Sequence, residues 1–274
     1  TASICETGTY QLVGTATTSV TGIISWTSSG DGTFNDPTLE DPIYIPGLAD
    51  IAGINNTVTL TMTVSNAPCS PDATDAIDLT IYDAPTADAG APTASICETG
   101  TYQLVGTATT SVIGTILWTT SGDGTWDDAT IEDPIYTPGA GDIAGTNNTV
   151  TLTMTVSNAP CSPDATDAIA LTIYDVPTAN AGPAASICEG FTHIISGATA
   201  TNNTGITWIS SGTGAITAGA GTLTPTYTPS AADILAGSVT LTLTVTGNAP
   251  CTPATSTMIL TIDPTPNTGP IYHN

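Results

Sequence analysis

Residues 57–64 read Thr-Val-Thr-Leu-Thr-Met-Thr-Val, and this strict alternation decides the fold class. A period of two places the apolar side chains on one face of an extended strand and the threonines on the other. Equivalent stretches occur at residues 149–156 and 239–246. β-branched residues favour half-buried strands, and the many Gly and Pro residues favour turns. The sequence therefore predicts an all-β protein.

The alternating strand belongs to a unit that is repeated along the chain. Residues 1–20 recur unchanged at 93–112, and residues 55–77 recur unchanged at 147–169, so both pairs are offset by 92 residues. A unit of this length is too long for a solenoid repeat, but it suits an immunoglobulin-type sandwich, which needs about 100 residues. We therefore expect independently folding domains joined in a row.

A third, diverged copy follows the first two, since Ser186-Ile187-Cys188 matches Ser3-Ile4-Cys5. The linkers between copies are short and contain proline, which stiffens them. We expect each copy to bury one tryptophan between its two sheets; these residues are Trp26, Trp118 and Trp208. The predicted fold is a tandem array of immunoglobulin-like β-sandwich domains, with boundaries at residues 1–86, 87–178 and 179–274.

The charge balance excludes several classes of partner. The chain has no Lys or Arg and 24 Asp and Glu residues, which gives a formal charge of −24. Without basic side chains it cannot neutralise phosphates, so we expect no nucleic-acid partner. No run of 18 apolar residues is present, so we expect no direct membrane insertion.

Cysteine usage indicates an oxidising compartment, and hence a secreted, extracellular or cell-surface location. The six cysteines are Cys5, Cys69, Cys97, Cys161, Cys188 and Cys251. The chain opens in the middle of the repeat pattern at Thr1, so we expect a mature or excised piece of a longer exported protein.

Two disulfide pairings are open. Nearly equal sequence separations favour pairs inside each copy, which are Cys5–Cys69, Cys97–Cys161 and Cys188–Cys251. However, the first cysteine of a copy lies at the turn between the first two strands, and the second lies in the loop between the last two. In an immunoglobulin-type sandwich these turns lie at opposite ends, too far apart for a disulfide. The alternative is a staggered pairing between consecutive copies, Cys5–Cys161 and Cys97–Cys251, which leaves Cys69 and Cys188 for preceding and following modules or subunits.

Several motifs in fixed order carry a resemblance to a known family. The first copy contains Ile-Cys-Glu from residue 4, Trp-Thr-Ser-Ser-Gly-Asp-Gly-Thr from residue 26, Asp-Ile-Ala-Gly from residue 50 and Ala-Pro-Cys from residue 67. This order resembles the PKD-like and immunoglobulin-like tandem repeats of giant Bacteroidetes surface proteins, including gliding-motility adhesins of the type 9 secretion pathway. The resemblance covers nearly the whole chain and implies surface display, but it supplies no ligand.

Two functions from different classes follow. The first is a structural stalk or fibre segment of an extracellular adhesin or filament, whose partners are neighbouring repeats or identical subunits joined end to end. The alternative is an adhesive module that binds a glycan or a protein. We expect no enzymatic activity and no cofactor, because the only histidines, His193 and His273, have no counterpart in the other copies.

Calcium is the one metal that the acidic loops suggest, since it prefers hard oxygen ligands. The weak candidates are Asp31 and Asp36 in the first copy and Asp123 and Asp128 in the second. The third copy lacks the acid of the Ser-Gly-Asp-Gly motif, which favours ordinary solvated turns instead. The linker acids Asp83, Asp88 and Asp175 are a second candidate calcium site.

Overall fold

The alternating strands pair as long antiparallel hairpins, and each hairpin forms the centre of a four-stranded sheet. The computed structural model describes residues 1–274 except 13–22, 54, 69, 105–113, 268 and 270–274. Among the described residues, the strands of each copy form two facing sheets, and only the third copy has a further two-stranded pair. The fold is therefore a row of β-sandwiches, as the sequence predicts.

In the first domain, the central hairpin has a strand on either side, and the outer strand next to its second arm runs parallel to that arm. The four-stranded sheet has the order β1 (Ala2–Cys5), β7 (Ala73–Tyr82), β6 (Asn56–Ser65) and β3 (Ile23–Ser28). The facing sheet has the order β2 (Tyr10–Gln11), β5 (Ile43–Ile45) and β4 (Thr33–Phe34).

The second domain repeats this arrangement. Its larger sheet consists of β10 (Thr115–Thr120), β13 (Asn148–Ser157), β14 (Ala165–Tyr174) and β8 (Thr93–Cys97). Its smaller sheet consists of β11 (Thr125–Trp126), β12 (Ile135–Thr137) and β9 (Tyr102–Gln103).

The third domain keeps the two sheets and adds a short pair of strands. The larger sheet consists of β16 (Ala185–Cys188), β23 (Ala254–Asp263), β22 (Ser238–Thr246) and β19 (Gly205–Ser210). The smaller sheet consists of β17 (His193–Ile194), β21 (Thr226–Thr228) and β20 (Ala215–Ala218), and the added pair is β15 (Thr178–Asn180) with β18 (Thr199–Thr201).

Each domain has its own apolar core, built by the inward face of the alternating strand. In β13, Val150, Leu152 and Met154 are buried, whereas the intervening Thr151 is exposed. One tryptophan packs into each core, with exposed fractions of 6% at Trp26, 2% at Trp118 and 5% at Trp208. The described core residues fall into three separate clusters, one in each copy.

One short helix departs from the all-β pattern. Helix α1 (Ala231–Ala236) lies in the third domain, where Ser230 caps its first turn and Gly237 ends it in the left-handed conformation. The first two copies have Asp-Ile-Ala-Gly in the corresponding loop, and the third has Asp-Ile-Leu-Ala-Gly. The additional residue and the Ser230 cap allow one helical turn and a half to form.

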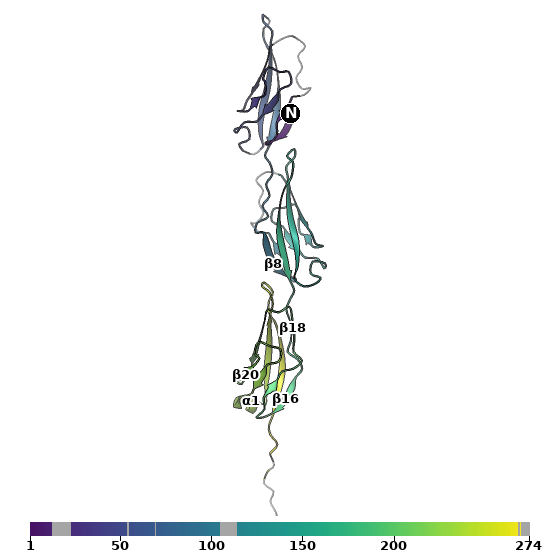
Figure 1. Ribbon diagram of the computed structural model, residues 1–274, viewed down its shortest axis with the longest axis vertical. Coiled ribbons are helices and arrows are strands. Elements are labelled where there is room, and N and C mark those ends of the chain that lie inside the picture. Colours follow the sequence, from purple (N-terminus) through teal and green to yellow (C-terminus); the bar gives the residue numbers. More distant parts are fainter. Residues whose placement is uncertain (13–22, 54, 69, 105–113, 268, 270–274) are drawn as a thin grey trace, which may run out of the picture.

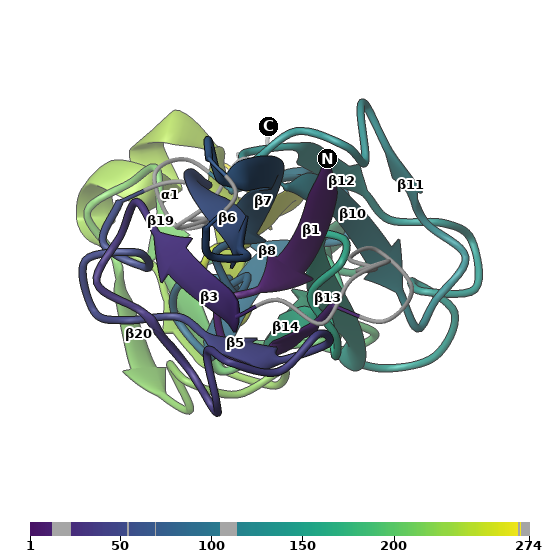
Figure 2. The same cartoon turned by 90° about the horizontal axis from the view of Figure 1, so that it is seen from above.

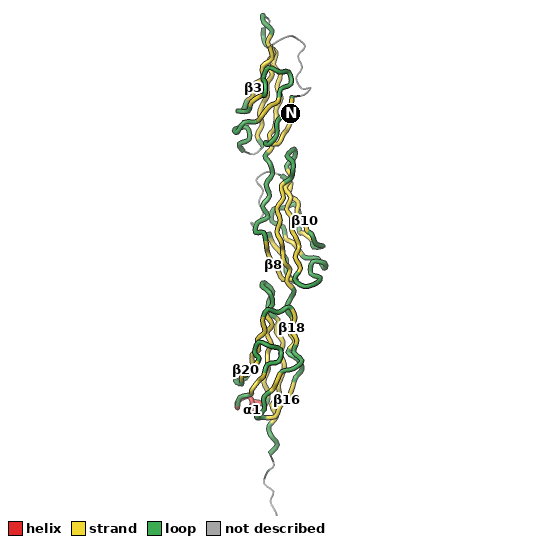
Figure 3. The backbone as a smooth tube through the Cα atoms, viewed as in Figure 1, coloured by secondary structure: helices red, strands yellow, loops and turns green. Residues whose placement is uncertain are grey.

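The domains follow one another along a single long axis, so the molecule is a rod (Figure 1). Seen along that axis, their projections overlap (Figure 2). Strands run mainly along the rod, and loops gather at the ends of each domain (Figure 3). This arrangement brings the β13–β14 loop of the second domain up to the exit of the first.

Candidate functional site

The joints between domains are covalently closed. At the first joint, Cys5 at the end of β1 forms a disulfide with Cys161 in the β13–β14 loop of the next domain, with 4.7 Å between the Cα atoms. This distance lies in the ordinary range for disulfides. Since β1 runs parallel to β7 and Cys5 is opposite Tyr82, the bond lies where the chain leaves the first domain.

The loop that carries Cys161 also contacts the linker directly. Asn158, which is 5% exposed, donates its side-chain amide to the carbonyl oxygen of Asp83 at 2.9 Å. The Sγ atom of Cys161 carries no proton in a disulfide, yet it lies 3.3 Å from the carbonyl oxygens of both Tyr82 and Asp83. The beginning of the linker is thus enclosed between two domains.

A glutamate directly after the first cysteine holds the linker from the other side. The backbone N–H of Glu6 donates to the carbonyl of Tyr82 at 2.8 Å, and its carboxylate accepts from the N–H of Ala84 at 3.0 Å. Together these bonds fix the chain from Tyr82, the last residue of β7, to Ala84. We call this arrangement the glutamate clamp.

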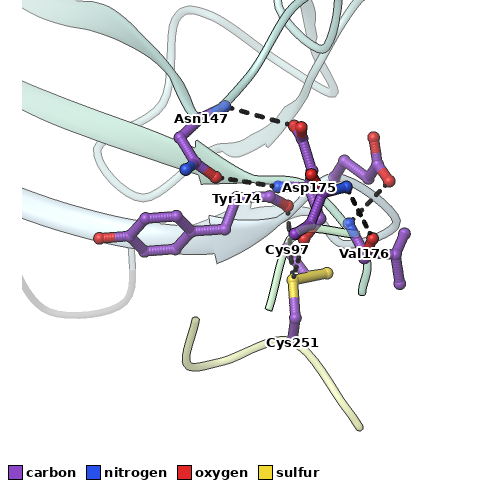
Figure 4. The surroundings of a disulfide bond; sticks show 8 residues. Cys97, Asn147, Tyr174, Asp175, Val176 and Cys251 are labelled. Carbon is purple, nitrogen blue, oxygen red and sulfur yellow. Dashed lines mark hydrogen bonds between the residues drawn. A yellow bond between two sulfur atoms is a disulfide. The ribbon is translucent and has the colours of Figure 1, made fainter. Parts of the chain in front are cut away.

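The second joint has the same construction. Cys97 and Cys251 form a disulfide with 4.9 Å between Cα atoms, and Figure 4 shows it beside the end of β14. Glu98 repeats the glutamate clamp. Its N–H donates to the carbonyl of Tyr174 at 2.9 Å, and its carboxylate accepts from the N–H of Val176 at 2.9 Å.

Additional contacts fasten the linker at this second joint. The N–H of Asn147 donates to the Asp175 carboxylate at 3.3 Å, as Figure 4 shows. The side-chain amide of Asn202, from the third domain, donates to the carbonyl of Val176 at 3.0 Å. Pro177 packs against Gly247, where an added Cβ would lie 3.0 Å from the proline ring. Residues of both domains therefore hold the linker in place.

The structure has the staggered pairing, so the alternative of pairs inside each copy is wrong for Cys5–Cys69, Cys97–Cys161 and Cys188–Cys251. The physical reason is the one that the topology gives: in the second and third copies, where both cysteines are described, they lie at opposite ends of the sandwich. Cys188 is free and exposed, and Cys69 lies outside the described residues.

Each domain also contains a buried carboxylate that the sequence did not single out. Asp50 is 2% exposed and accepts hydrogen bonds from the N–H groups of Asp31 (3.0 Å), Gly32 (2.9 Å) and Gly47 (3.0 Å) and from the Tyr44 hydroxyl (2.5 Å). Burial alone would raise the pKa of Asp50, but these hydrogen bonds outweigh it and lower the pKa. Burial of the Tyr44 hydroxyl and its hydrogen bond to Asp50 raise the pKa of Tyr44 to about 12.

This carboxylate explains the Ser-Gly-Asp-Gly motif. A Cβ on Gly30 would lie 1.6 Å from the carboxylate of Asp50, and one on Gly32 would lie 2.6 Å from it, so neither position has room for a side chain. The third domain keeps the arrangement, with Asp233 accepting from the N–H groups of Thr213 (3.0 Å) and Gly214 (2.8 Å). The element common to all copies is thus the inner aspartate, which is Asp50, Asp142 or Asp233.

The proposed calcium ligands serve as hydrogen-bond acceptors for the nearby backbone. The Asp31 carboxylate accepts from the N–H groups of Ala49 at 3.0 Å and Asp50 at 3.2 Å, and Asp123 accepts from Asp142 at 3.1 Å. Asp36 and Asp128 each cap a turn. Hydrogen bonds from the Thr38 hydroxyl and N–H lower the pKa of Asp36, and those from Thr130 lower the pKa of Asp128.

The linker aspartates also accept hydrogen bonds from nearby backbone N–H groups. The Asp88 carboxylate accepts from the N–H of Gly90 at 2.8 Å, and that of Asp175 accepts from Asn147. Across the part of the chain that the structure describes, no three or more His, Cys, Asp or Glu side chains come together as a metal-binding group.

The remaining sequence candidates lie apart from the joints. His193 is in β17 opposite Tyr227, and burial lowers its pKa. His273 lies outside the described residues. Within the described ranges, no helix has the length and apolar character needed to cross a bilayer.

Comparison with known proteins gives the fold. No family model matches the chain, and no curated protein matches it. Among solved structures, the chain is similar to an I-band fragment of titin, with a TM-score of 0.53 and 12% identity over 94% of this chain and 93% of that one. A glutamate-to-alanine variant of three titin immunoglobulin domains gives the same TM-score and coverage at 14% identity. The chain is a tandem array of immunoglobulin-like β-sandwich domains.

Proposed function

We propose that this chain is a structural stalk or fibre segment of an extracellular cell-surface protein, in which domains 1–86, 87–178 and 179–274 act as spacers. The observation that carries the proposal is the pair of disulfides that join consecutive domains, Cys5–Cys161 and Cys97–Cys251. A disulfide inside a domain would stabilise that domain alone. One placed across a joint restricts the angle between domains, which is useful when length and direction matter.

The composition supports the same proposal. A charge of −24 with no Lys or Arg provides solubility and keeps neighbouring stalks apart. Disulfides require an oxidising compartment, which agrees with display outside the cell. The resemblance to tandem repeats of Bacteroidetes surface adhesins supports the cell surface as the location.

Small-angle X-ray scattering of the purified chain tests the stalk. Strands of this length give a rod of roughly 100–130 Å, whose radius of gyration is about 30–38 Å. A compact chain of 274 residues would have a radius of about 19 Å. We expect the larger value, and a measurement near the smaller one would refute a stalk.

A quadruple variant tests the role of the disulfides. With Cys5, Cys161, Cys97 and Cys251 all changed to Ser, we expect a smaller mean radius and a wider distribution of sizes, because the joints can bend. The matched control is Cys188→Ser, which leaves both joints intact. Identical scattering from the quadruple variant and the control would show that the disulfides do not set the stiffness.

The alternative of an adhesive module makes a different prediction. The near-identity of the first two copies favours spacers, because duplication changes length without creating a new site. A glycan array probed with the whole chain distinguishes the two functions, since a reproducible glycan signal would favour adhesion.

A further inference from the structure

The outer end of the third domain repeats the Cys-Glu half of the joint that the first two domains use. Cys188 ends β16 opposite Asp263, as Cys5 ends β1 opposite Tyr82 and Cys97 ends β8 opposite Tyr174. In the two inner joints this cysteine is bonded to the loop of the following domain. At the outer end it is a free, exposed thiol.

The glutamate clamp is already formed at this end. The N–H of Glu189 donates to the carbonyl of Asp263 at 2.8 Å. Its carboxylate accepts from the N–H of Thr265 at 3.0 Å and from the Thr265 hydroxyl at 2.5 Å. The backbone after β23 is thus held as the linkers are held after β7 and β14, although no domain described in the chain lies beyond it.

One apolar side chain, Phe191, lies beside Cys188 where the inner joints have Gly8 and Gly100. The N–H of Phe191 donates to the carbonyl of Cys188 at 3.3 Å, in the turn where Gly8 donates to Cys5 at 2.8 Å. The Phe191 side chain is 66% exposed. Phe191 thus adds exposed apolar surface next to the free thiol.

We infer that Cys188, Glu189 and Phe191 form an open joint that takes the Asn-Ala-Pro-Cys loop of a second copy of this chain and forms a disulfide with it. This inference rests on the proposed stalk function. The occupant follows from the inner joints, where Asn158 and Cys161 contact the linker in one and Cys251 does so in the other, each from an Asn-Ala-Pro-Cys loop.

The first copy carries the same loop in its sequence. Residues 65–71 read Ser-Asn-Ala-Pro-Cys-Ser-Pro, identical to residues 157–163. This stretch itself has no acidic residue, which limits the charge repulsion as it approaches Glu189 and Asp263 in a chain that carries −24 overall. The two surfaces belong to opposite ends of a rod, so the contact is head-to-tail and repeats into a filament rather than closing into a dimer.

The chemistry needs an oxidant, for which a low-molecular-weight disulfide such as glutathione disulfide suffices. The Cys188 thiolate attacks glutathione disulfide, forming a mixed disulfide and releasing one glutathione. The thiolate of Cys69 in a second copy then attacks the Cys188 sulfur and releases the second glutathione. Two thiols thus lose two electrons and two protons, and one glutathione disulfide becomes two glutathiones.

Complementary single-cysteine variants test the inference. The native chain is incubated with glutathione disulfide and examined on non-reducing gels. We expect a ladder of multimers that dithiothreitol abolishes. Neither Cys188→Ser nor Cys69→Ser alone should give a ladder, whereas an equimolar mixture of the two should give a single disulfide-linked dimer.

Mass spectrometry identifies the bond. Digestion with an Asp- or Glu-directed protease is required because the chain has no Lys or Arg. We expect the Cys69–Cys188 peptide at least about tenfold more abundant than any Cys188–Cys188 peptide. Predominance of Cys188–Cys188, or absence of multimers from the native chain, would overturn the inference.

A further variant keeps the thiol but removes the clamp. Glu189→Ala should slow formation of the Cys69–Cys188 bond several-fold, whereas Glu132→Ala, at an exposed site in another domain, should not. Scattering from the Cys188→Ser monomer separates this inference from the stalk. An extended Cys188→Ser monomer, together with a native chain that forms no ladder, refutes only the open joint, and a compact monomer refutes the stalk itself.

Discussion

At the scale of single residues, the buried aspartate of each domain has a pKa that its surroundings lower. Burial alone would raise the pKa of Asp233, but hydrogen bonds from the Ser230 backbone, the Tyr227 hydroxyl and neighbouring donors lower it to about 2. A carboxylate whose pKa is lower in the folded state stabilises the fold at a pH above its unfolded pKa, near 3.9. That stabilisation is lost as the pH falls toward 2.

Asp233→Asn tests this directly. At pH 7 we expect the variant to destabilise the third domain by about 2–4 kcal/mol, because charge-assisted hydrogen bonds are lost and an amide NH₂ group faces backbone donors. Between about pH 4 and pH 2 the native domain should lose stability steeply, while the variant should change less. Thermal unfolding followed across this pH range measures both effects.

The control for this variant is Asp36→Asn. Asp36 is half-buried and caps a turn through Thr38, so its replacement should change the free energy of unfolding much less than Asp233→Asn does. Equal effects of the two substitutions would contradict the role assigned to the buried carboxylate.

The inner aspartate also shows where sequence reasoning ended. Asp31 and Asp50 are both loop aspartates near glycines, and nothing in their sequence neighbourhood says which of them is buried. A signal was nevertheless present. The Ser-Gly-x-Gly motif and an Asp-Ile pair occur at similar spacing in all three copies, whereas the acid inside the motif is replaced by Thr213 in the third. An acid kept in every copy points to a structural role.

At the scale of elements, the alternating strand is the part of the fold that the sequence predicts most directly. In β13 the period of two puts fully buried Leu152 next to exposed Thr151. The long strands β6, β13 and β22 follow this pattern because one face packs on a core and the other faces solvent.

A pair of substitutions in β13 measures the difference between its faces. Leu152→Ala should destabilise the second domain by about 2–5 kcal/mol, since it leaves a cavity in a packed core. Thr151→Ala should stay within about 0.5 kcal/mol. Scanning calorimetry, which separates domain transitions, is the measurement. If both variants lower the same transition equally, the assignment of the inner face is wrong.

The short strands and the helix could not be predicted from the sequence pattern. Strands β2 and β4 have two residues each, too few for a period to be recognised. Helix α1 has six residues, and a helix this short is not stable in isolation. It therefore depends on the Ser230 cap and on packing against the sheet. These elements are set by tertiary contacts.

At the scale of the whole molecule, the charge of −24 is unbalanced by any Lys or Arg. Repulsion between carboxylates therefore opposes folding, and added salt should screen it. Raising NaCl from 10 mM to 500 mM should stabilise the first two domains, which carry most of the acidic residues, by roughly 1 kcal/mol, which corresponds to about 4–8 °C in the melting temperature of a small domain. A fall in melting temperature with salt would contradict this reading.

Calcium at matched ionic strength is the specific control for that experiment. Since the described loop carboxylates already accept hydrogen bonds from their own backbone, calcium should give no increase beyond that of sodium. An additional increase that Asp31→Asn and Asp123→Asn abolish would restore the calcium sites suggested by the acidic loops.

For the cysteines, the sequence spacing and the strand topology predict different disulfide pairings. The separation between Cys5 and Cys69 equals that between Cys97 and Cys161, which suits pairs within a copy equally well. Only the direction of the strands, which sends the two turns to opposite ends, favours the staggered pairs. The free thiol of Cys188 and the clamp that Glu189 forms beside it could not be predicted, because the sequence does not show which carboxylate reaches Thr265.

The staggered bonds also determine how far the molecule can be unravelled under tension. By the main chain, Cys5 and Cys251 are separated by about 246 residues, which would extend to about 810–890 Å. Through Cys161 and back to Cys97, the route crosses only about 64 residues, or about 210–230 Å. The two disulfides therefore limit the distance that can open between Cys5 and Cys251. Even if every domain unfolded under tension, the stalk could not extend beyond this shorter covalent route.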